Sequence, residues 1–142
     1  MFTLAILKPD AVAAGHAGKI LAHLEQAGFA MRAARLVRLS TAQAEAFYGV
    51  HRERPFFRSL VTFMTSGPAL VLMLERDAAV AALREAIGAT DPAEAKAGTI
   101  RKLYAQSKER NAIHASDSAE NAAREIAFLF PEAELAELLR PS

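Results

Sequence analysis

A histidine followed by a dense polar turn is the part of this chain best suited to chemistry. Residues 111–118 read Asn-Ala-Ile-His-Ala-Ser-Asp-Ser, and Glu125 lies eleven residues after His114. Because imidazole titrates near neutral pH, a carboxylate beside it can hold it neutral, oriented and nucleophilic. The alternative is a strand-end histidine whose ring is satisfied by a backbone carbonyl, and spacing alone favours that alternative.

Cations that could hold phosphate come from three separate parts of the chain. Lys8 follows a short apolar run, Arg84 lies in a helical pattern, and Arg101 lies in a long polar stretch. The guanidinium fork and the compact ammonium both suit phosphate oxygens. Phosphoryl transfer needs such cations together with an in-line nucleophile. Each residue taken alone, however, is by default interpreted as a solvated surface charge.

The elements that must position these residues alternate between strand and helix patterns. We expect strands at Phe2–Leu7, Phe29–Leu39, Ala69–Glu75 and Ala112–His114, and helices at Gly18–Ala27, from Ser40/Thr41, from Arg54-Pro55 to about Thr65, at Asp77–Ile87, and from about Ala119 to Phe130. This order favours an α+β sandwich with a mixed or antiparallel sheet. Periodicity leaves the strand order open.

Three local patterns refine this interpretation. In the second strand, Phe29, Met31, Val37 and Leu39 are expected on one face, with Arg32 and Arg38 on the other. Residues 88–110 are expected to form a long, mostly irregular excursion, and such loops are usually functional. Asp117 and Glu120 have the spacing of a capping box for the last helix.

Composition narrows the class of protein. The chain has 142 residues, 52% of them hydrophobic, no cysteine and a net charge of +1. We therefore expect one domain over residues 1–142, soluble and cytoplasmic, without disulfides or a thiolate nucleophile. No segment approaches the apolar length of a membrane span, and the N-terminal residues lack the features of a signal peptide.

The Lys8-Pro9-Asp10 run and the segment around His114 together resemble the nucleoside diphosphate kinase family, and the resemblance extends from Thr3 to Phe130. It implies a ferredoxin-like βαββαβ sandwich with an antiparallel four-stranded sheet and extra helices. It also implies a ping-pong reaction in which His114 carries the terminal phosphate of a nucleoside triphosphate to a nucleoside diphosphate, with broad base specificity.

The same resemblance implies a role for each matching residue. The catalytic set is His114, Glu125, Ser116, Lys8 and Tyr48, and the nucleotide-binding set is Lys8, Phe56, Leu60, Arg84, Thr90, Arg101 and Asn111. Phe56 would stack on the base with Leu60 in the same slot, and stacking accepts any base. Asn111 would contact the ribose, and the nucleotide-binding loop would span about residues 88–111. For Tyr48, a catalytic role and a packing role stay equally open.

The resemblance also implies the cofactor and the partners. Mg²⁺ would be held mainly by the substrate phosphates without a dedicated protein site, and Asp117 is a candidate for a water-mediated contact. The partners would be nucleoside di- and triphosphates and further copies of the chain. The copies would form a dimer through the Phe29–Leu39 strand, built further into a tetramer or hexamer. No membrane partner is expected.

Two other functions are weighed against this one. A nucleotide-binding regulatory module on the same fold is disfavoured because every matching catalytic residue is present. A nucleic-acid-binding protein is disfavoured because no basic stripe with interleaved aromatics is visible.

Departures from the family pattern are few. Ala115 stands where the family usually has glycine, Lys102 and Leu103 differ from the residues common there, and the tail at residues 131–142 is short. Since left-handed backbone would strain an alanine beside the nucleophile, we predict a negative φ at Ala115.

Overall fold

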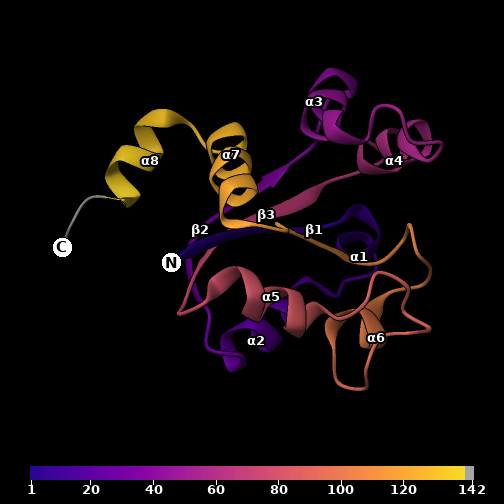
Figure 1. Cartoon of the computed structure of the whole chain (residues 1–142), viewed down its shortest axis with the longest axis horizontal. Helices are drawn as coiled ribbons and strands as arrows, with labels where there is room; N and C mark the ends of the chain where they lie inside the picture. Colours follow the sequence, from indigo (N-terminus) through magenta and orange to yellow (C-terminus); the bar gives the residue numbers. More distant parts are fainter. Residues whose placement is uncertain (140–142) are drawn as a thin grey trace.

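The framework of the protein is a four-stranded antiparallel sheet, seen in a computed structural model that describes residues 1–139. Its strands are β1 (Phe2–Leu7), β2 (Ala30–Val37), β3 (Ala69–Glu75) and β4 (Ile113–Ala115), in the spatial order β2-β3-β1-β4 (Figure 1). Every strand pair is antiparallel. The expected α+β, ferredoxin-like sandwich is therefore confirmed.

Helices cover both faces of the sheet. They are α1 (Pro9–Ala13), α2 (Ala17–Gln26), α3 (Thr41–Phe47), α4 (Phe57–Met64), α5 (Ala79–Ile87), α6 (Ile100–Tyr104), α7 (Ala119–Leu129) and α8 (Glu132–Leu138), with a single 3₁₀ turn at Gly49–His51. Figure 1 shows α3, α4 and α7 on one side of the sheet and α2, α5 and α6 on the other. The sheet is thus the middle layer of three.

Strand β1 explains why its sequence is apolar at successive positions. Leu4 and Ile6 point into the core beneath α3, α4 and α7, whereas Ala5 and Leu7 point into the core formed with α2 and α5. Alternate side chains of a strand face opposite sides, so a strand covered on both sides needs apolar residues throughout. β1 ends where Lys8 and Pro9 begin the turn into α1.

Strand β2 differs from its predicted alternation. Its pairing with β3 shifts between Met31 and Ala33, which places a bulge in the strand. Because one extra residue exchanges the two faces of a strand, Phe29, before the bulge, packs in the core with α2 and α5, whereas Leu39, after the bulge, packs in the core beneath α3, α4 and α7. The prediction that Phe29 and Met31 share one face with Val37 and Leu39 is therefore wrong, since periodicity alone does not reveal a bulge.

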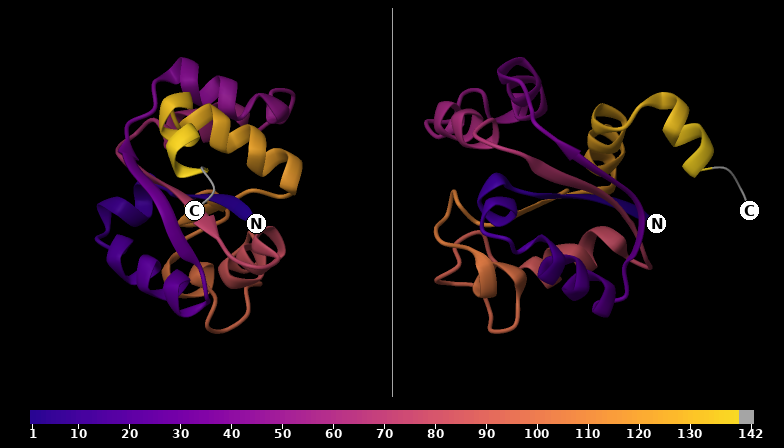
Figure 2. Two further views of the ribbon diagram at one scale, coloured as in Figure 1. Left: turned by 90° about the vertical axis from the view of Figure 1, so that its left-hand side faces the viewer. Right: turned by 180° about the vertical axis from the view of Figure 1, so that it is seen from behind.

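Two expectations near the C-terminus are also wrong. The N-cap of α7 is Ser118, whose side chain accepts the Asn121 N–H at 3.0 Å, so the capping box expected at Asp117 and Glu120 is not formed. The segment expected as a tail contains α8, which projects from the body (Figure 2) and packs Leu138 against the core. Residues 140–142 of that tail lie outside the described residues.

The loop of residues 88–110 is irregular except for α6, a single short helix that the sequence did not predict. Thr99 caps α6 by accepting the Lys102 N–H. This cap fixes the position of Arg101 within the loop, because Arg101 lies in the first turn of the capped helix.

A tight turn precedes β4. Ala112 has a φ of 73°, and the Ile113 N–H donates to the Asn111 carbonyl at 2.9 Å, which closes a γ-turn. The Ala112 N–H donates to Asp10 Oδ2 at 3.1 Å, and the Ala112 carbonyl accepts the Lys8 N–H at 2.9 Å. These contacts hold an alanine in the left-handed region just before the strand that carries the histidine.

Ala115, three residues later, is extended backbone at the end of β4. Among residues 1–139, the non-glycine residues with positive φ are Ala78 and Ala112 only. The predicted negative φ at Ala115 is therefore confirmed, and the left-handed residue of this segment is Ala112 instead.

The two alanines provide a matched test of this strain. Ala112→Gly and Ala115→Gly each remove one buried methyl group and add the same freedom to the unfolded chain. Only the first also relieves a left-handed alanine. We expect Ala112→Gly to be less destabilising by about 1–2 kcal/mol. Urea denaturation of both variants measures the difference, and an Ala115→Gly protein at least as stable as Ala112→Gly would contradict this account.

Candidate active site

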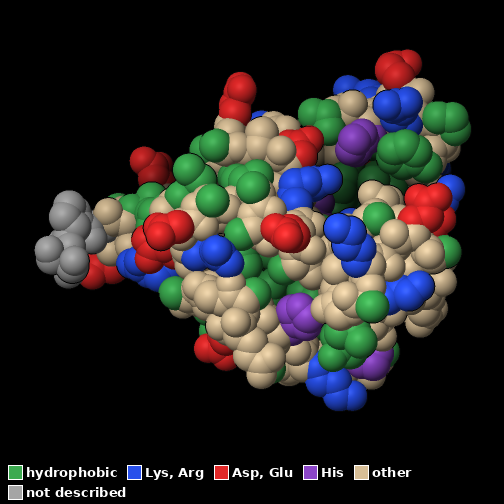
Figure 3. Space-filling model, turned by 60° about the horizontal axis from the view of Figure 1, so that its bottom comes forward, with side chains coloured by type: hydrophobic (Ala, Val, Ile, Leu, Met, Phe, Trp, Pro, Cys, Tyr) green, Lys and Arg blue, Asp and Glu red, His purple; other side chains and the backbone are tan. Residues whose placement is uncertain are grey.

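A cleft with two connected lobes opens beside β1 and β4. The lobes have volumes of about 480 and 380 Å³. Both are lined by Lys8, Tyr48, His51, Phe56, Thr90 and His114. Leu60, Lys108, Glu109 and Asn111 line the first lobe only, whereas Arg84, Arg101 and Glu125 line the second only. Figure 3 shows a hollow bordered by histidine, lysine and arginine side chains on this face.

His114 lies at the centre of this cleft. It is the middle residue of β4, paired with Ile6 of β1, and its Nε2 lies 2.8 Å from Glu125 Oε1 of α7. The Ser116 hydroxyl donates to the same carboxylate oxygen at 2.7 Å. Because a carboxylate only accepts, the imidazole proton is on Nε2 and the lone pair is on Nδ1.

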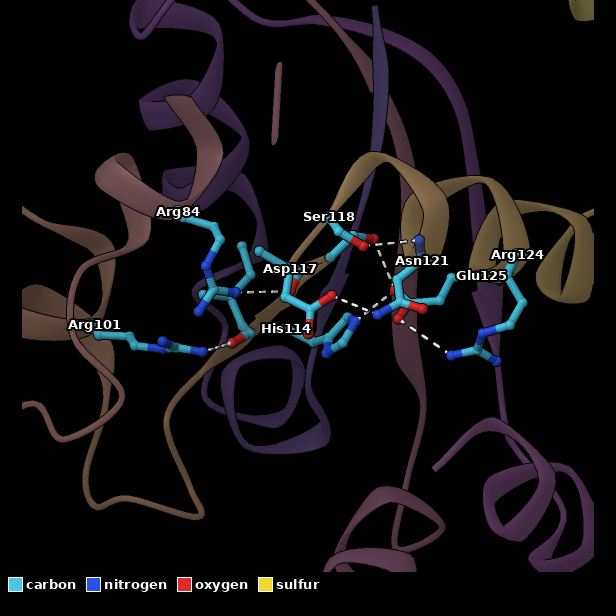
Figure 4. Close-up of polar contacts among 11 residues, drawn as sticks. Arg84, Arg101, His114, Asp117, Ser118, Asn121, Arg124 and Glu125 are labelled. Atoms are coloured by element: carbon cyan, nitrogen blue, oxygen red, sulfur yellow. Dashed lines mark hydrogen bonds and ion pairs between the residues drawn. The ribbon is translucent and has the colours of Figure 1, made fainter. Parts of the chain in front are cut away.

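That tautomer leaves Nδ1 available. Within residues 1–139, no hydrogen bond to His114 Nδ1 is found. Figure 4 shows His114 between Arg84 and Arg101 on one side and Glu125 on the other. The ring is thus oriented by one nitrogen and can attack through the other.

Burial and hydrogen bonding together determine the protonation state of this pair. Burial lowers the pKa of His114, the nearby Lys8 and Arg101 charges lower it further, and Glu125 opposes them. For Glu125, burial raises the pKa, but the hydrogen bonds from His114 and Ser116 bring the pKa below its ordinary value. The pair is therefore a neutral imidazole against a carboxylate, which is the form a histidine nucleophile requires.

The three cations predicted from separate parts of the sequence do converge on this cleft. Arg101 donates to the carbonyls of Ile113 at 2.8 Å and Gly88 at 3.1 Å, and Arg84 donates to the Ala115 carbonyl at 3.3 Å. Both arginines are therefore attached to the backbone of β4, on either side of the histidine (Figure 4).

The cations perturb one another. Burial, together with the charge of Arg101, lowers the pKa of Lys8 to about 8. Burial and the charge of Arg84 lower the pKa of Arg101 to about 10. Crowded like charges favour the binding of an anion.

The remaining predicted residues lie in the same cleft. Phe56, the N-cap residue of α4, is 46% exposed, and Leu60 lies one turn further along the helix. Asn111 donates to the Thr90 carbonyl at 3.4 Å, and its Oδ1 is buried without a partner in the described part of the chain. All predicted site residues thus line a lobe except Ser116, which is buried behind Glu125.

Tyr48 packs against the histidine edge to face, with 6.2 Å between ring centroids. Its hydroxyl is buried and has no partner within residues 1–139. Burial, followed by the charge of Glu125, raises its pKa. The phenol is therefore a neutral donor at the wall of both lobes.

Sequence reasoning missed several residues of the cleft. His51 lines both lobes and its ring lies 5.4 Å from that of Phe56, a contact that the short separation of the two residues could have suggested. Lys108 and Glu109 line the first lobe. No periodic pattern marks them, because they lie in the irregular part of the loop.

Neither a metal cage nor a membrane span is found in the described structure. Residues 1–139 contain no group of three or more acidic or histidine side chains that could hold a metal ion. In the same residues, no helix is long and apolar enough to cross a bilayer. Asp117 contributes a single exposed carboxylate to the second lobe, where its Oδ1 accepts from the Asn121 amide at 2.6 Å.

Known proteins resemble both the sequence and the structure. The family described as "Nucleoside diphosphate kinase" matches residues 2–135. A nucleoside diphosphate kinase of Halorhodospira halophila is 56% identical over 133 residues, which cover 94% of this chain and 94% of that protein. One of Anaeromyxobacter sp. (strain Fw109-5) is 54% identical over 130 residues, covering 92% and 89%.

Solved structures agree. The Aquifex aeolicus nucleoside diphosphate kinase superposes with a TM-score of 0.91 at 47% identity, covering 94% of this chain and 96% of that one. A Halobacterium salinarum nucleoside diphosphate kinase in complex with CDP has a TM-score of 0.90 at 37% identity, covering 94% and 90%.

A ferredoxin-like sandwich whose cleft joins a histidine to converging cations is the architecture of a nucleotide phosphotransferase. The chain belongs to the nucleoside diphosphate kinase family. It is an enzyme that transfers the terminal phosphate of a nucleoside triphosphate to a nucleoside diphosphate.

The histidine pair predicts a pH dependence. Burial lowers the pKa of His114 below 6.5, so its ring is neutral at pH 7 and becomes protonated only in more acidic solution. Glu125→Gln removes the interaction that raises this pKa, and we expect the pKa to fall further. NMR titration of the His114 ring measures both values. A higher pKa in Glu125→Gln would contradict the assignment, and Glu120→Gln, on the exposed side of α7, is the matched control.

Proposed function

We propose that His114 Nδ1 is the nucleophile of a ping-pong phosphoryl transfer. The observation that carries this proposal is the hydrogen bond between Nε2 and Glu125, which leaves Nδ1 with the lone pair. In the first half-reaction, the Nδ1–P bond forms, the bond between the γ-phosphorus and its bridging oxygen breaks, and the diphosphate leaves with that oxygen. In the second half-reaction, a terminal oxygen of another diphosphate attacks and releases the neutral ring.

The proposed role of the cations is to hold and stabilise the phosphates. Lys8, Arg84 and Arg101 supply positive charge where negative charge spreads over the transferring group. Thr90 adds a hydroxyl at the wall shared by both lobes. Tyr48 would donate from its neutral phenol to a phosphate oxygen beside the histidine. The crowding that lowers the pKa of Lys8 and Arg101 supports this assignment.

We assign the base to the first lobe. The exposed ring of Phe56 offers a stacking surface with Leu60 beside it, and stacking favours no particular base. The Oδ1 of Asn111, which has no partner among residues 1–139, suits a ribose hydroxyl. A related structure from Halobacterium salinarum contains CDP, which supports a slot that accepts pyrimidines. Broad base specificity follows from this arrangement.

The donor set suits Mg²⁺ held mainly by substrate. Mg²⁺ keeps several waters and binds through one or two carboxylates plus phosphates. The second lobe provides one exposed carboxylate, Asp117, and is also lined by Lys8, Arg84 and Arg101. Asp117 would accept a water of the ion, and the ion would neutralise charge on the two outer phosphates.

The domain organisation, the location and the assembly of the chain belong to the same proposal. Residues 1–142 act as one domain, with residues 88–111 as the nucleotide-binding loop. A cytoplasmic location fits a cysteine-free chain that acts on nucleotides. Edge strand β2 pairs with its copy to form a dimer, which is the unit of a tetramer or hexamer. Exposed Met31 and Leu36 on this strand, and a small apolar hollow beside it, support that pairing.

The phosphohistidine is tested by labelling. Incubation with γ-labelled ATP and Mg²⁺ should give label on the protein that is acid-labile and alkali-stable, and that transfers to an added nucleoside diphosphate. We expect His114→Ala to abolish the label while nucleotide binding persists. His23→Ala on α2 is the matched control and should label normally. Labelled His114→Ala protein would overturn the assignment.

The assembly is tested by light scattering. The chain has a mass of 15.3 kDa, and we expect a multiple of at least two at micromolar concentration. Leu36→Asp places a charge on the β2 edge and should shift the population toward monomer. Leu103→Asp on α6, at a residue of similar exposure, should not. A monomeric wild-type protein would contradict the proposed dimer.

A further inference from the structure

One charged side chain of the first lobe has no task in the phosphate chemistry described above. Lys108 lines the lobe that contains Phe56 and Leu60, and does not line the second lobe, where Arg84 and Arg101 lie. Across residues 1–139, no hydrogen bond or ion pair of Lys108 is found. Its ammonium is therefore available to a ligand in the first lobe.

The loop around Lys108 is held in place by its neighbours. Ser59 of α4 donates to Glu109 Oε2 at 2.7 Å, and the Arg110 guanidinium lies 5.3 Å from the centre of the Phe63 ring. Both contacts tie the loop to the helix that carries the stacking residues. Lys108 consequently has a fixed attachment point beside the base slot, although its own side chain is exposed.

An ammonium group can recognise only hydrogen-bond acceptors at the edge of a base. It has three donors and no acceptor, so it is attracted to an exocyclic carbonyl oxygen and gains nothing from an exocyclic amino group. Purines stacked on Phe56 would present either a 6-oxo or a 6-amino group in the plane of the ring. Pyrimidines present a 4-oxo or a 4-amino group in the same way.

We propose that Lys108 gives this enzyme a preference for nucleotides whose base carries an exocyclic oxygen at that edge over those that carry an amino group. This inference rests on the proposed function, because it takes the first lobe as the base slot. Stacking supplies the affinity common to all bases, and Lys108 adds the difference. For one exposed charge-assisted hydrogen bond, we expect a preference of about three- to tenfold.

Two pairs of substrates isolate this effect. Inosine and adenosine diphosphates differ at the 6-position of the purine, and uridine and cytidine diphosphates differ at the 4-position of the pyrimidine. Each is offered as acceptor to the phosphorylated enzyme, and kcat/KM is measured. We expect the oxo member of each pair to be preferred. Lys108→Met, which keeps the length and removes the charge, should bring both ratios to within about twofold of unity.

Matched controls separate this role from others. Lys19→Met, at an exposed lysine of α2, should keep the wild-type ratios. If Lys108→Met lowered kcat/KM equally for all four acceptors, Lys108 would be a phosphate ligand and the proposal would be overturned. Equal kcat/KM within each pair in the wild-type protein would overturn it as well.

Direct binding keeps this test distinct from the proposed function. Calorimetric titration of the four diphosphates reports the base preference even if no phosphorylated enzyme forms. Absence of a phosphohistidine in the wild-type protein would sink the proposed function alone. Equal dissociation constants within each pair, with normal phosphohistidine formation, would sink the role of Lys108 alone.

Discussion

The hydrogen bond between His114 and Glu125 is the interaction on which the rest of the site depends. It joins β4 to α7 in a buried position, at a distance of 2.8 Å. A buried carboxylate without partners is costly, and here the imidazole and the Ser116 hydroxyl share one of its oxygens. The same bond selects the tautomer of the histidine. The same hydrogen bond therefore serves both the packing of α7 on the sheet and the activation of the imidazole ring. Neither His114 nor Glu125 is satisfied unless β4 and α7 pack together.

The strand that carries the histidine is short and is held from three directions. β4 pairs with β1 over three residues only, and a left-handed Ala112 precedes it. Asp10 accepts the Ala112 N–H, and Arg101 and Arg84 donate to carbonyls on either side of His114. The arginines that face the phosphate lobe thus also fix the strand. The strained backbone at Ala112 persists because several hydrogen bonds around it hold it in this conformation.

The sequence predicted those elements whose pattern is decided locally. The bounds of β1 and β3 match the prediction, because a strand buried on both faces leaves a continuous apolar run. The prediction of one shared face for Phe29, Met31, Val37 and Leu39 was wrong, and α8 was not predicted, because a bulge and a short amphipathic segment depend on what they pack against.

In the site, spacing alone could relate Glu125 to His114 through one helical segment. The convergence of Lys8, Arg84 and Arg101 is a consequence of the strand order, which periodicity does not contain. It could be expected only through the family resemblance. Lys108 had no signal of either kind, since the path of an irregular loop is set by tertiary contacts such as that between Ser59 and Glu109. The cleft also favours an anionic substrate, because burial and the charge of Arg101 lower the pKa of Lys8 to about 8 and make its charge unfavourable in the free protein. A bound polyphosphate adds the missing negative charge and raises that pKa, so binding would take up a proton when the pH is near 8. The charged form of Lys8 is thus stabilised when the site binds the chemical group that it transfers.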